Sequence, residues 1–201
     1  MRAYTATLAS VLILPLFSCR MAVPAPRDPS APRVEVKCND SGPVGQFKLR
    51  ASNGVLQIRG EFQDGKKEGT WDFWDSSGTQ TVKLSYHDGM KNGPCTMWYS
   101  ALSGDPRRGG RLKLDMAFVN DQVDGVKMSY YSDPGIGSLR SEDVFDHGRI
   151  VKARHWTPER KELSAEEAMM HAEKDLEADQ RYFDSMDKLV ADNATCPREH
   201  N

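Results

Sequence analysis

The chain has 201 residues, and its 27 Lys and Arg residues nearly balance its 29 Asp and Glu residues, giving a formal net charge of −2. This balance argues against a nucleic-acid-binding protein, which usually carries a basic excess or a basic patch. No second apolar run follows the N-terminal segment, which excludes a polytopic membrane protein. The remaining ~180 residues are enough for one hydrophobic core.

The N-terminus predicts export. Arg2 supplies a short positive segment, and the apolar stretch from Leu8 to Phe17 is too short to span a bilayer as a mature helix. The stretch ends in Leu16-Phe17-Ser18-Cys19, which resembles the lipobox of bacterial lipoproteins. This resemblance implies a lipoprotein signal peptide over residues 1–18 and a lipidated Cys19 as the first mature residue. An ordinary cleaved signal peptide and an uncleaved anchor are the alternatives.

Residues 19–36 are expected to form a proline-rich tether. Prolines at this density prevent regular secondary structure and favour an extended polyproline conformation; they are Pro24, Pro26, Pro29 and Pro32. A lipid on Cys19 would hold the chain to a membrane through this tether. Because Arg20 rather than an aspartate follows Cys19, the lipoprotein resemblance implies the outer membrane in a cell that has one. The expected location is therefore the cell envelope.

Three further cysteines follow Cys19, and an exported compartment permits disulfide bonds between them. Cys38 stands at the start of the folded part, and Cys196 stands near its end. We expect a Cys38–Cys196 disulfide that ties the two ends together, and Cys95 would then be a buried free thiol. Sequence alone leaves the other pairings open.

A glycine and aromatic repeat occupies the middle of the chain. An aromatic residue stands three positions before a turn residue, and another glycine follows that turn residue by four positions. The second glycines are spaced by 24 residues from Gly45 to Gly69 and again from Gly69 to Gly93, and by 32 residues from Gly93 to Gly125. The turns are centred on Asp64-Gly65, Asp88-Gly89, Asn120-Asp121 and His147-Gly148.

The chemistry of these positions predicts β-hairpins. Asp-Gly and Asn-Asp steps suit tight turns with positive φ, and the flanking aromatic and β-branched residues suit short strands. Trp71 and Phe73 alternate, as do Cys95 and Met97, so each pair points to one face of its strand. A single hairpin cannot bury such a face alone, but stacked hairpins can. We therefore expect a mainly β fold, an elongated twisted antiparallel sheet over residues 37–156.

This repeat resembles the MORN-repeat variant family of bacteria, whose pattern is an aromatic residue, two spaced glycines, an aromatic strand and a turn glycine. The segment from Phe62 to Gly78 matches that pattern well, whereas the segment from Phe118 to Gly135 departs from it. In the departing unit Asp121 replaces the turn glycine and Lys127 replaces the tryptophan. The resemblance implies an antiparallel sheet of MORN-like hairpins, with members that are antitoxin-like or envelope lipoproteins. It implies no catalytic residue.

Residues 157–201 are predicted to form a helix and a tail. Ser164 and Glu167 form a capping box, and a helix of about 28 residues could then run to Ala191. The segment from Ser164 to Asp192 carries nine acidic and three basic residues, whereas the rest of the mature chain is mildly basic. The helix has an apolar stripe, with Gln180 filling one step: Ala165, Met169, Ala172, Leu176, Phe183, Met186 and Val190. We expect this stripe to pack on the sheet; the alternative is a helix that binds a partner.

The sequence contains no motif for catalysis or for cofactor binding. It lacks the nucleophile-elbow, P-loop, dinucleotide-binding and Cys-x-x-Cys patterns. Glu167, His171 and Asp175 align on one helix face, but an ordinary polar face explains them better than a metal site. We therefore expect no enzyme activity, no cofactor and no metal.

The expected function is protein binding or scaffolding at the membrane. Trp74, Trp98 and Tyr130 are the candidate partner-binding residues, because an outward row of aromatic side chains would form a contact surface. Packing of these three residues against the helix is the alternative role. Two other functions stay open, namely an immunity or antitoxin-like protein that neutralises one protein partner, and a hydrolase that acts on an envelope polymer.

Overall fold

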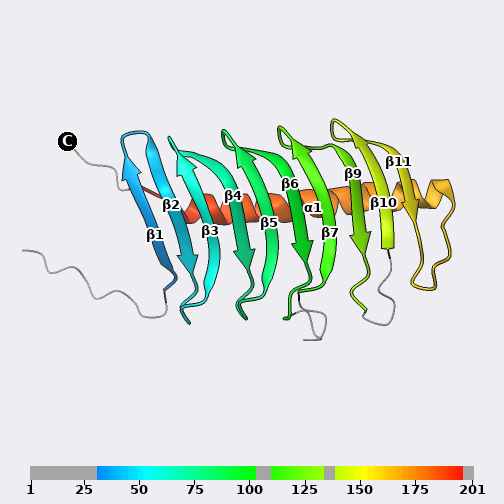
Figure 1. Ribbon diagram of the computed structural model, residues 1–201, viewed down its shortest axis with the longest axis horizontal. Helices are drawn as coiled ribbons and strands as arrows, with labels where there is room; N and C mark the ends of the chain where they lie inside the picture. Colours follow the sequence, from blue (N-terminus) through cyan, green and yellow to red (C-terminus); the bar gives the residue numbers. More distant parts are fainter. Residues whose placement is uncertain (1–30, 103–109, 134–138, 197–201) are drawn as a thin grey trace, which may run out of the picture.

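The computed structural model describes residues 31–102, 110–133 and 139–196. The expected signal peptide, Cys19 and most of the expected tether lie outside these residues. The described chain forms one open antiparallel sheet of consecutive hairpins and one C-terminal helix, which confirms the predicted fold class (Figure 1). The strands are β1 Arg33–Asn39, β2 Gly42–Arg50, β3 Leu56–Gln63, β4 Lys66–Trp74, β5 Gln80–His87, β6 Met90–Trp98, β7 Leu112–Val119, β8 Gln122–Val123, β9 Gly125–Tyr130, β10 Leu139–Asp146 and β11 Arg149–His155.

The predicted hairpin turns are confirmed by their backbone angles. Both central residues of each turn have positive φ, from 49° and 79° at Asp64 and Gly65 to 49° and 78° at His147 and Gly148. Positive φ at both positions is the signature of a type I′ turn, whose twist matches that of the flanking strands. The end of the departing repeat unit, at Gly135, lies outside the described residues.

A backbone hydrogen bond links each of these turns to the preceding hairpin. The Gly89 amide donates to the Lys67 carbonyl at 3.0 Å, and the Asp121 amide donates to the Lys91 carbonyl at 2.9 Å. Equivalent bonds begin at Gly65 and Gly148. The repeat therefore joins neighbouring hairpins at their tips as well as along their strands.

β1 begins within the stretch expected to be tether. Its first residue is Arg33, four residues before the predicted boundary at residue 37. Val34 pairs with Leu49 of β2, and Val36 packs against the hydrophobic core, so these residues extend the sheet. The alternation of Val34 and Val36 directly after the last proline is the signal for this strand.

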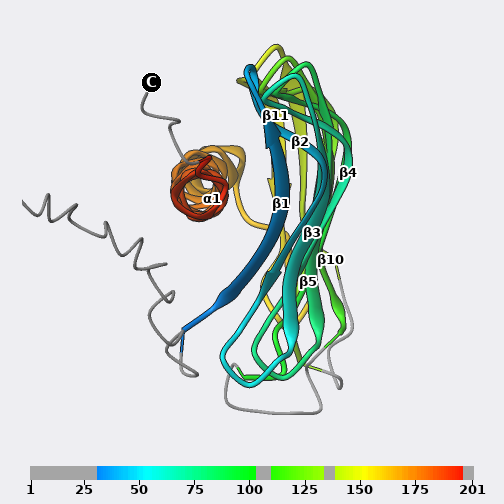
Figure 2. The same cartoon turned by 90° about the vertical axis from the view of Figure 1, so that its left-hand side faces the viewer.

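The C-terminal helix α1, Ala165–Asn193, lies across the concave face of the sheet (Figure 2). Ser164 is its N-cap and forms the predicted capping box with Glu167. A helix of 29 residues is about 43 Å long, which matches the width of ten neighbouring strands. In the described residues, no helix is long and apolar enough to cross a membrane.

The helix buries most of the predicted stripe against the sheet. Ala172, Phe183, Met186 and Val190 are buried, whereas Ala165, in the first turn, is exposed. At the one polar position of the stripe, the half-buried residue is Asp179. Gln180, which was predicted there, is exposed. The expected packing of an acidic helix on a more basic sheet is therefore confirmed, with Asp179 as a contact that the prediction missed.

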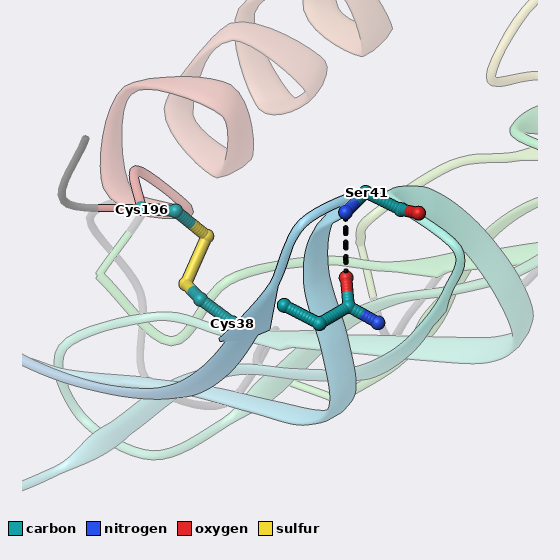
Figure 3. Close-up of a disulfide and its surroundings, with 4 residues drawn as sticks. Cys38, Ser41 and Cys196 are labelled. Atoms are coloured by element: carbon teal, nitrogen blue, oxygen red, sulfur yellow. Dashed lines mark hydrogen bonds between the residues drawn. A yellow bond between two sulfur atoms is a disulfide. The ribbon is translucent and has the colours of Figure 1, made fainter. Parts of the chain in front are cut away.

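A disulfide bond joins the two ends of the folded part. Cys38 of β1 is bonded to Cys196, which follows α1, with a Cα–Cα distance of 5.8 Å (Figure 3). This is the predicted pairing. Cys95 is free and fully buried, also as predicted, and burial raises the pKa of its thiol.

Candidate functional site

The helix-facing side of the sheet changes from apolar to polar at its C-terminal end. One row of paired residues crosses every long strand and is apolar through Met97 and Leu114. It then continues as Ser129, Ser141 and His155 on β9, β10 and β11. Lys127 and Asp143 are paired beside this row, and all five polar residues are at most 7% exposed. A buried polar cluster of this size in place of apolar core marks a candidate functional site.

Side chains of α1 at intervals of four residues lie over successive strands. His171 stacks on His155 of β11, Asp175 binds Arg140 of β10, and Asp179 binds Lys127 of β9. Phe183 then contacts Phe118 of β7, and Asp187 binds Lys91 of β6. Four helical residues advance about 6 Å, close to the spacing between strands.

Lys127 is the most deeply buried cation of this cluster. It stands where Trp71 and Cys95 stand in the hairpins β3–β4 and β5–β6, two residues after the second glycine. Its ammonium group donates to Asp179 at 2.6 Å, and Asp143 is its cross-strand partner on β10. A buried ammonium requires such a partner, because an unpaired charge would lose far more hydration energy than it regains.

Arg140 reaches the helix from an irregular position in β10. The register between β9 and β10 shifts at this residue, which lies between the paired residues Leu139 and Ser141. Its two terminal nitrogens donate to Asp175 at 2.6 and 3.1 Å, and one of them also lies 3.4 Å from the hydroxyl of Ser129. Burial acts to raise the pKa of Asp175, but Arg140 outweighs it, so that pKa lies below its ordinary value.

Asp143 and His155 form the innermost pair of the cluster. The Nε2 atom of His155 lies 3.0 Å from one carboxylate oxygen of Asp143, while the other oxygen is buried without a hydrogen-bond partner in the structure. The hydroxyl of Ser141 pairs with that of Ser129 at 2.7 Å. Among the described residues, no serine hydroxyl is hydrogen-bonded to His155, so no activated nucleophile can be identified in this cluster.

A cavity of about 280 Å³ opens between the sheet and α1 at this cluster. Its walls include the two ion pairs Lys127–Asp179 and Arg140–Asp175. Lys113 also lines it, at the corresponding register shift of β7, together with Ser129 and Tyr99. The cavity is partly open to solvent and combines charged groups with apolar wall area.

The other end of the sheet holds α1 through Asp187. This carboxylate accepts hydrogen bonds from Lys67, from the hydroxyl of Tyr86 at 2.6 Å and from Lys91 at 2.9 Å. Burial acts to raise the pKa of Asp187, but these donors outweigh it and lower that pKa. Lys67 and Lys91 hold equivalent positions in their hairpins, two residues before the second glycine, so one repeat position supplies both cations that bind Asp187.

Strand alternation places the side chains of the three predicted partner-binding residues on the convex face, and Tyr130 also lines the cavity beside α1. Trp74, Trp98 and Tyr130 are half-buried and end β4, β6 and β9. Each follows a residue whose side chain faces the helix, and strand alternation turns it outward. The guanidinium of Arg59 lies 5.5 Å from the ring of Trp74, and the hydroxyl of Tyr130 contacts Met128. These two contacts are with other residues of the sheet, and partner binding by the three aromatic residues stays a prediction.

β9 has the reverse polarity of the other central strands. Its helix-facing residues are Lys127 and Ser129, whereas its outward residues are Val126, Met128 and Tyr130. Val126 is 48% exposed and Met128 is 37% exposed. In β5, by comparison, Val82 and Leu84 face the helix and Lys83 faces outward. A strand with its apolar residues outward is a candidate interaction surface.

Glu167, His171 and Asp175 do not converge on one point. Glu167 caps the helix, His171 stacks on His155, and Asp175 binds Arg140. A different group, Asp124, Asp146 and His147, brings three potential ligand atoms within 4.8 Å at the hairpin tips. His147 already donates from its backbone to Asp124, and Asp146 contacts the ring of His147, so these groups serve the link between two hairpins.

The sequence prediction missed the polar cluster and the cavity. The departure of Lys127 from the repeat pattern was the one available signal, because it places a lysine where the repeat has a core residue. The partners of Lys127 could not be predicted, since Asp179 is 52 residues away on an element whose register against the sheet is set by tertiary packing.

Comparison with known proteins adds no assignment. The chain matches no model of a known protein family, and it has no match among curated proteins.

Proposed function

We propose that the protein is a non-catalytic binding module of the cell envelope, anchored by a lipid on Cys19, whose convex face takes a protein partner. The reversed polarity of β9 carries this proposal. Val126, Met128 and Tyr130 give the convex face an exposed apolar strip, although the opposite face of the same strand is polar. Covering such a strip with a partner removes apolar surface from water, which favours binding.

The residues around the strip indicate the chemistry of the partner. Trp98 of β6 adds an aromatic side chain beyond β7, and Val144 is paired with Val126 from β10. Met128 has Asp115 and Glu142 as its two cross-strand neighbours. A partner with an apolar patch flanked by Lys or Arg would complement this surface, and the acidic flanks would reject an acidic one.

Site-specific photo-cross-linking in native membranes tests the proposal. A photoreactive phenylalanine analogue at Met128 should give an adduct of discrete mass. The same analogue at Lys83, which lies in the same cross-strand row on β5, should not. Unlabelled wild-type protein should compete the adduct away, and the Met128→Glu variant, which changes only an exposed side chain, should not. Equal adducts at both positions would overturn the proposal.

The number of partners separates the candidate functions. One adduct at one-to-one stoichiometry would favour the immunity or antitoxin-like function, and several competing adducts would favour a scaffold.

The intact mass of protein from native membranes tests the anchor independently. Residues 19–201 plus acyl chains are expected, and a mass that begins at Met1 would contradict the lipid anchor.

A further inference from the structure

The cavity beside α1 has one positive charge that no carboxylate in the described part of the chain neutralises. Its walls carry three cations and two carboxylates. Lys127 is bound to Asp179 and Arg140 is bound to Asp175, each at 2.6 Å. Among the residues that the structure describes, no carboxylate lies within ion-pair distance of Lys113, whose ammonium group is 5.8 Å from the ring of Tyr182.

The position of Lys113 directs this charge into the cavity. The register between β6 and β7 shifts beside Lys113, as it does beside Arg140 between β9 and β10. Both shifts turn a basic side chain toward α1, since Lys113 reaches Tyr182 and Arg140 reaches Asp175. The two cations therefore line the same cavity from β7 and β10.

Arg140 and Lys113 also carry N–H groups that make no described hydrogen bond. A guanidinium has five N–H groups, and the hydrogen bonds of Arg140 to Asp175 and Ser129 leave some of them free. The ammonium of Lys113 has three N–H groups, and no described residue accepts a hydrogen bond from it. An anion between them would receive charge-assisted hydrogen bonds in a partly buried site, where such bonds are stronger than in water.

We propose that this cavity binds a carboxylate, held by Lys113 and Arg140, with its short apolar portion against Leu114 and Ala178. The net charge of the lining favours a monoanion, because a second negative charge would meet Asp175 and Asp179. The volume of about 280 Å³ is small for a ligand pocket, which suits a small carboxylic acid or the C-terminus of a peptide. This inference goes beyond the proposed function and does not depend on the convex face.

Paired probes test the proposal on the purified full-length protein. Propionate and propionamide have nearly the same shape and differ in charge, and so do acetyl-Ala-Ala and its C-terminal amide. Backbone amide shifts in nuclear magnetic resonance spectra should move for Ser129 and Tyr130 with each acid and should stay unchanged with each amide. Tighter binding of the peptide acid than of propionate would identify a chain terminus, and the reverse would identify a small acid.

Lys113→Gln should weaken binding of the acids by at least about tenfold, as expected for the loss of a hydrogen bond to a charged group. Lys83→Gln, at an exposed lysine on the convex face, should leave the affinity unchanged. Equal binding of acids and amides, absence of binding by both acids, or an unchanged affinity in Lys113→Gln would overturn the proposal. The comparison of acid with amide is made on the wild-type protein, so the test does not depend on folding of a variant.

Discussion

At the scale of single residues, one glycine makes room for the largest side chain of the core. Gly60 lies in β3 opposite Phe47, and a Cβ atom added there would lie 2.1 Å from the indole of Trp71. Trp71 is fully buried and contacts Phe47, Phe62 and Tyr86 through its ring. The absent side chain at Gly60 thus allows the aromatic cluster of the first hairpins to close.

Gly60→Ala should therefore destabilise the fold by about 1–3 kcal/mol, because an added methyl group must displace a packed ring. Chemical denaturation of the variant measures this loss. In a double-mutant cycle with Trp71→Leu, the penalty for the alanine should shrink, since the smaller side chain leaves space. An additive result in that cycle would show that the steric explanation is wrong.

At the scale of elements, α1 is held to the sheet by carboxylates spaced four and eight residues apart. Asp175, Asp179 and Asp187 each bind cations of the sheet, and Phe183 supplies an apolar contact among them. Asp187 accepts hydrogen bonds from three donors. Its loss would leave the positive charges of Lys67 and Lys91 only partly neutralised, with the two lysines side by side. This makes Asp187 the most sensitive helix position to test.

Asp187→Asn should reduce the free energy of unfolding at neutral pH by about 1.5–3 kcal/mol, the usual range for hydrogen bonds to a charged group. Because the folded state lowers the pKa of Asp187, its contribution is complete above the ordinary pKa near 4 and is lost as the pH falls through the lower, folded value. The stability gap between variant and wild type should therefore close in strong acid.

Denaturant unfolding at several pH values measures this gap. Asp184→Asn is the matched control, because Asp184 is exposed on the same helix and its only described contact is Gln180. A gap that does not change with pH would contradict the assignment of the stabilisation to the charge of Asp187.

At the scale of the whole molecule, α1 crosses the sheet and is covalently connected to both of its ends. Its N-terminus follows β11 through a short connection, and its C-terminal side is bonded to β1 through Cys196 and Cys38 (Figure 1). The disulfide anchors β1, the edge strand of the sheet, whose described strand partner is β2, to the C-terminal end of the fold. It spans 158 residues of chain, so it removes many conformations from the unfolded state.

Replacing both Cys38 and Cys196 with serine should lower the free energy of unfolding by about 4–5 kcal/mol, the loop-closure estimate for a loop of this length. Denaturant unfolding with and without reductant measures the effect. Reduced wild type should behave like the double variant, because Cys95 is buried and its raised pKa keeps its thiol protonated. An unchanged denaturant midpoint after complete reduction would contradict a stabilising role of the disulfide.

Local chemistry in the sequence determined the hairpin turns and the helix start. Asp64-Gly65 and its equivalents favour positive φ through their own side chains, and Ser164 and Glu167 cap each other within one turn. The pairing of Cys38 with Cys196 could also be predicted, because Cys38 starts the folded part of the chain and Cys196 stands near its end.

Only the tertiary structure decided what the faces of the sheet contact. The position of Lys127 in the core depends on Asp179, and the space for Trp71 depends on the missing side chain of Gly60 in the neighbouring strand. Strand alternation places Trp74, Trp98 and Tyr130 on one face, but which face α1 covers is decided by tertiary packing. These features follow from contacts between distant residues, and such contacts leave only a faint trace in local sequence, here the lysine at position 127 that breaks the repeat.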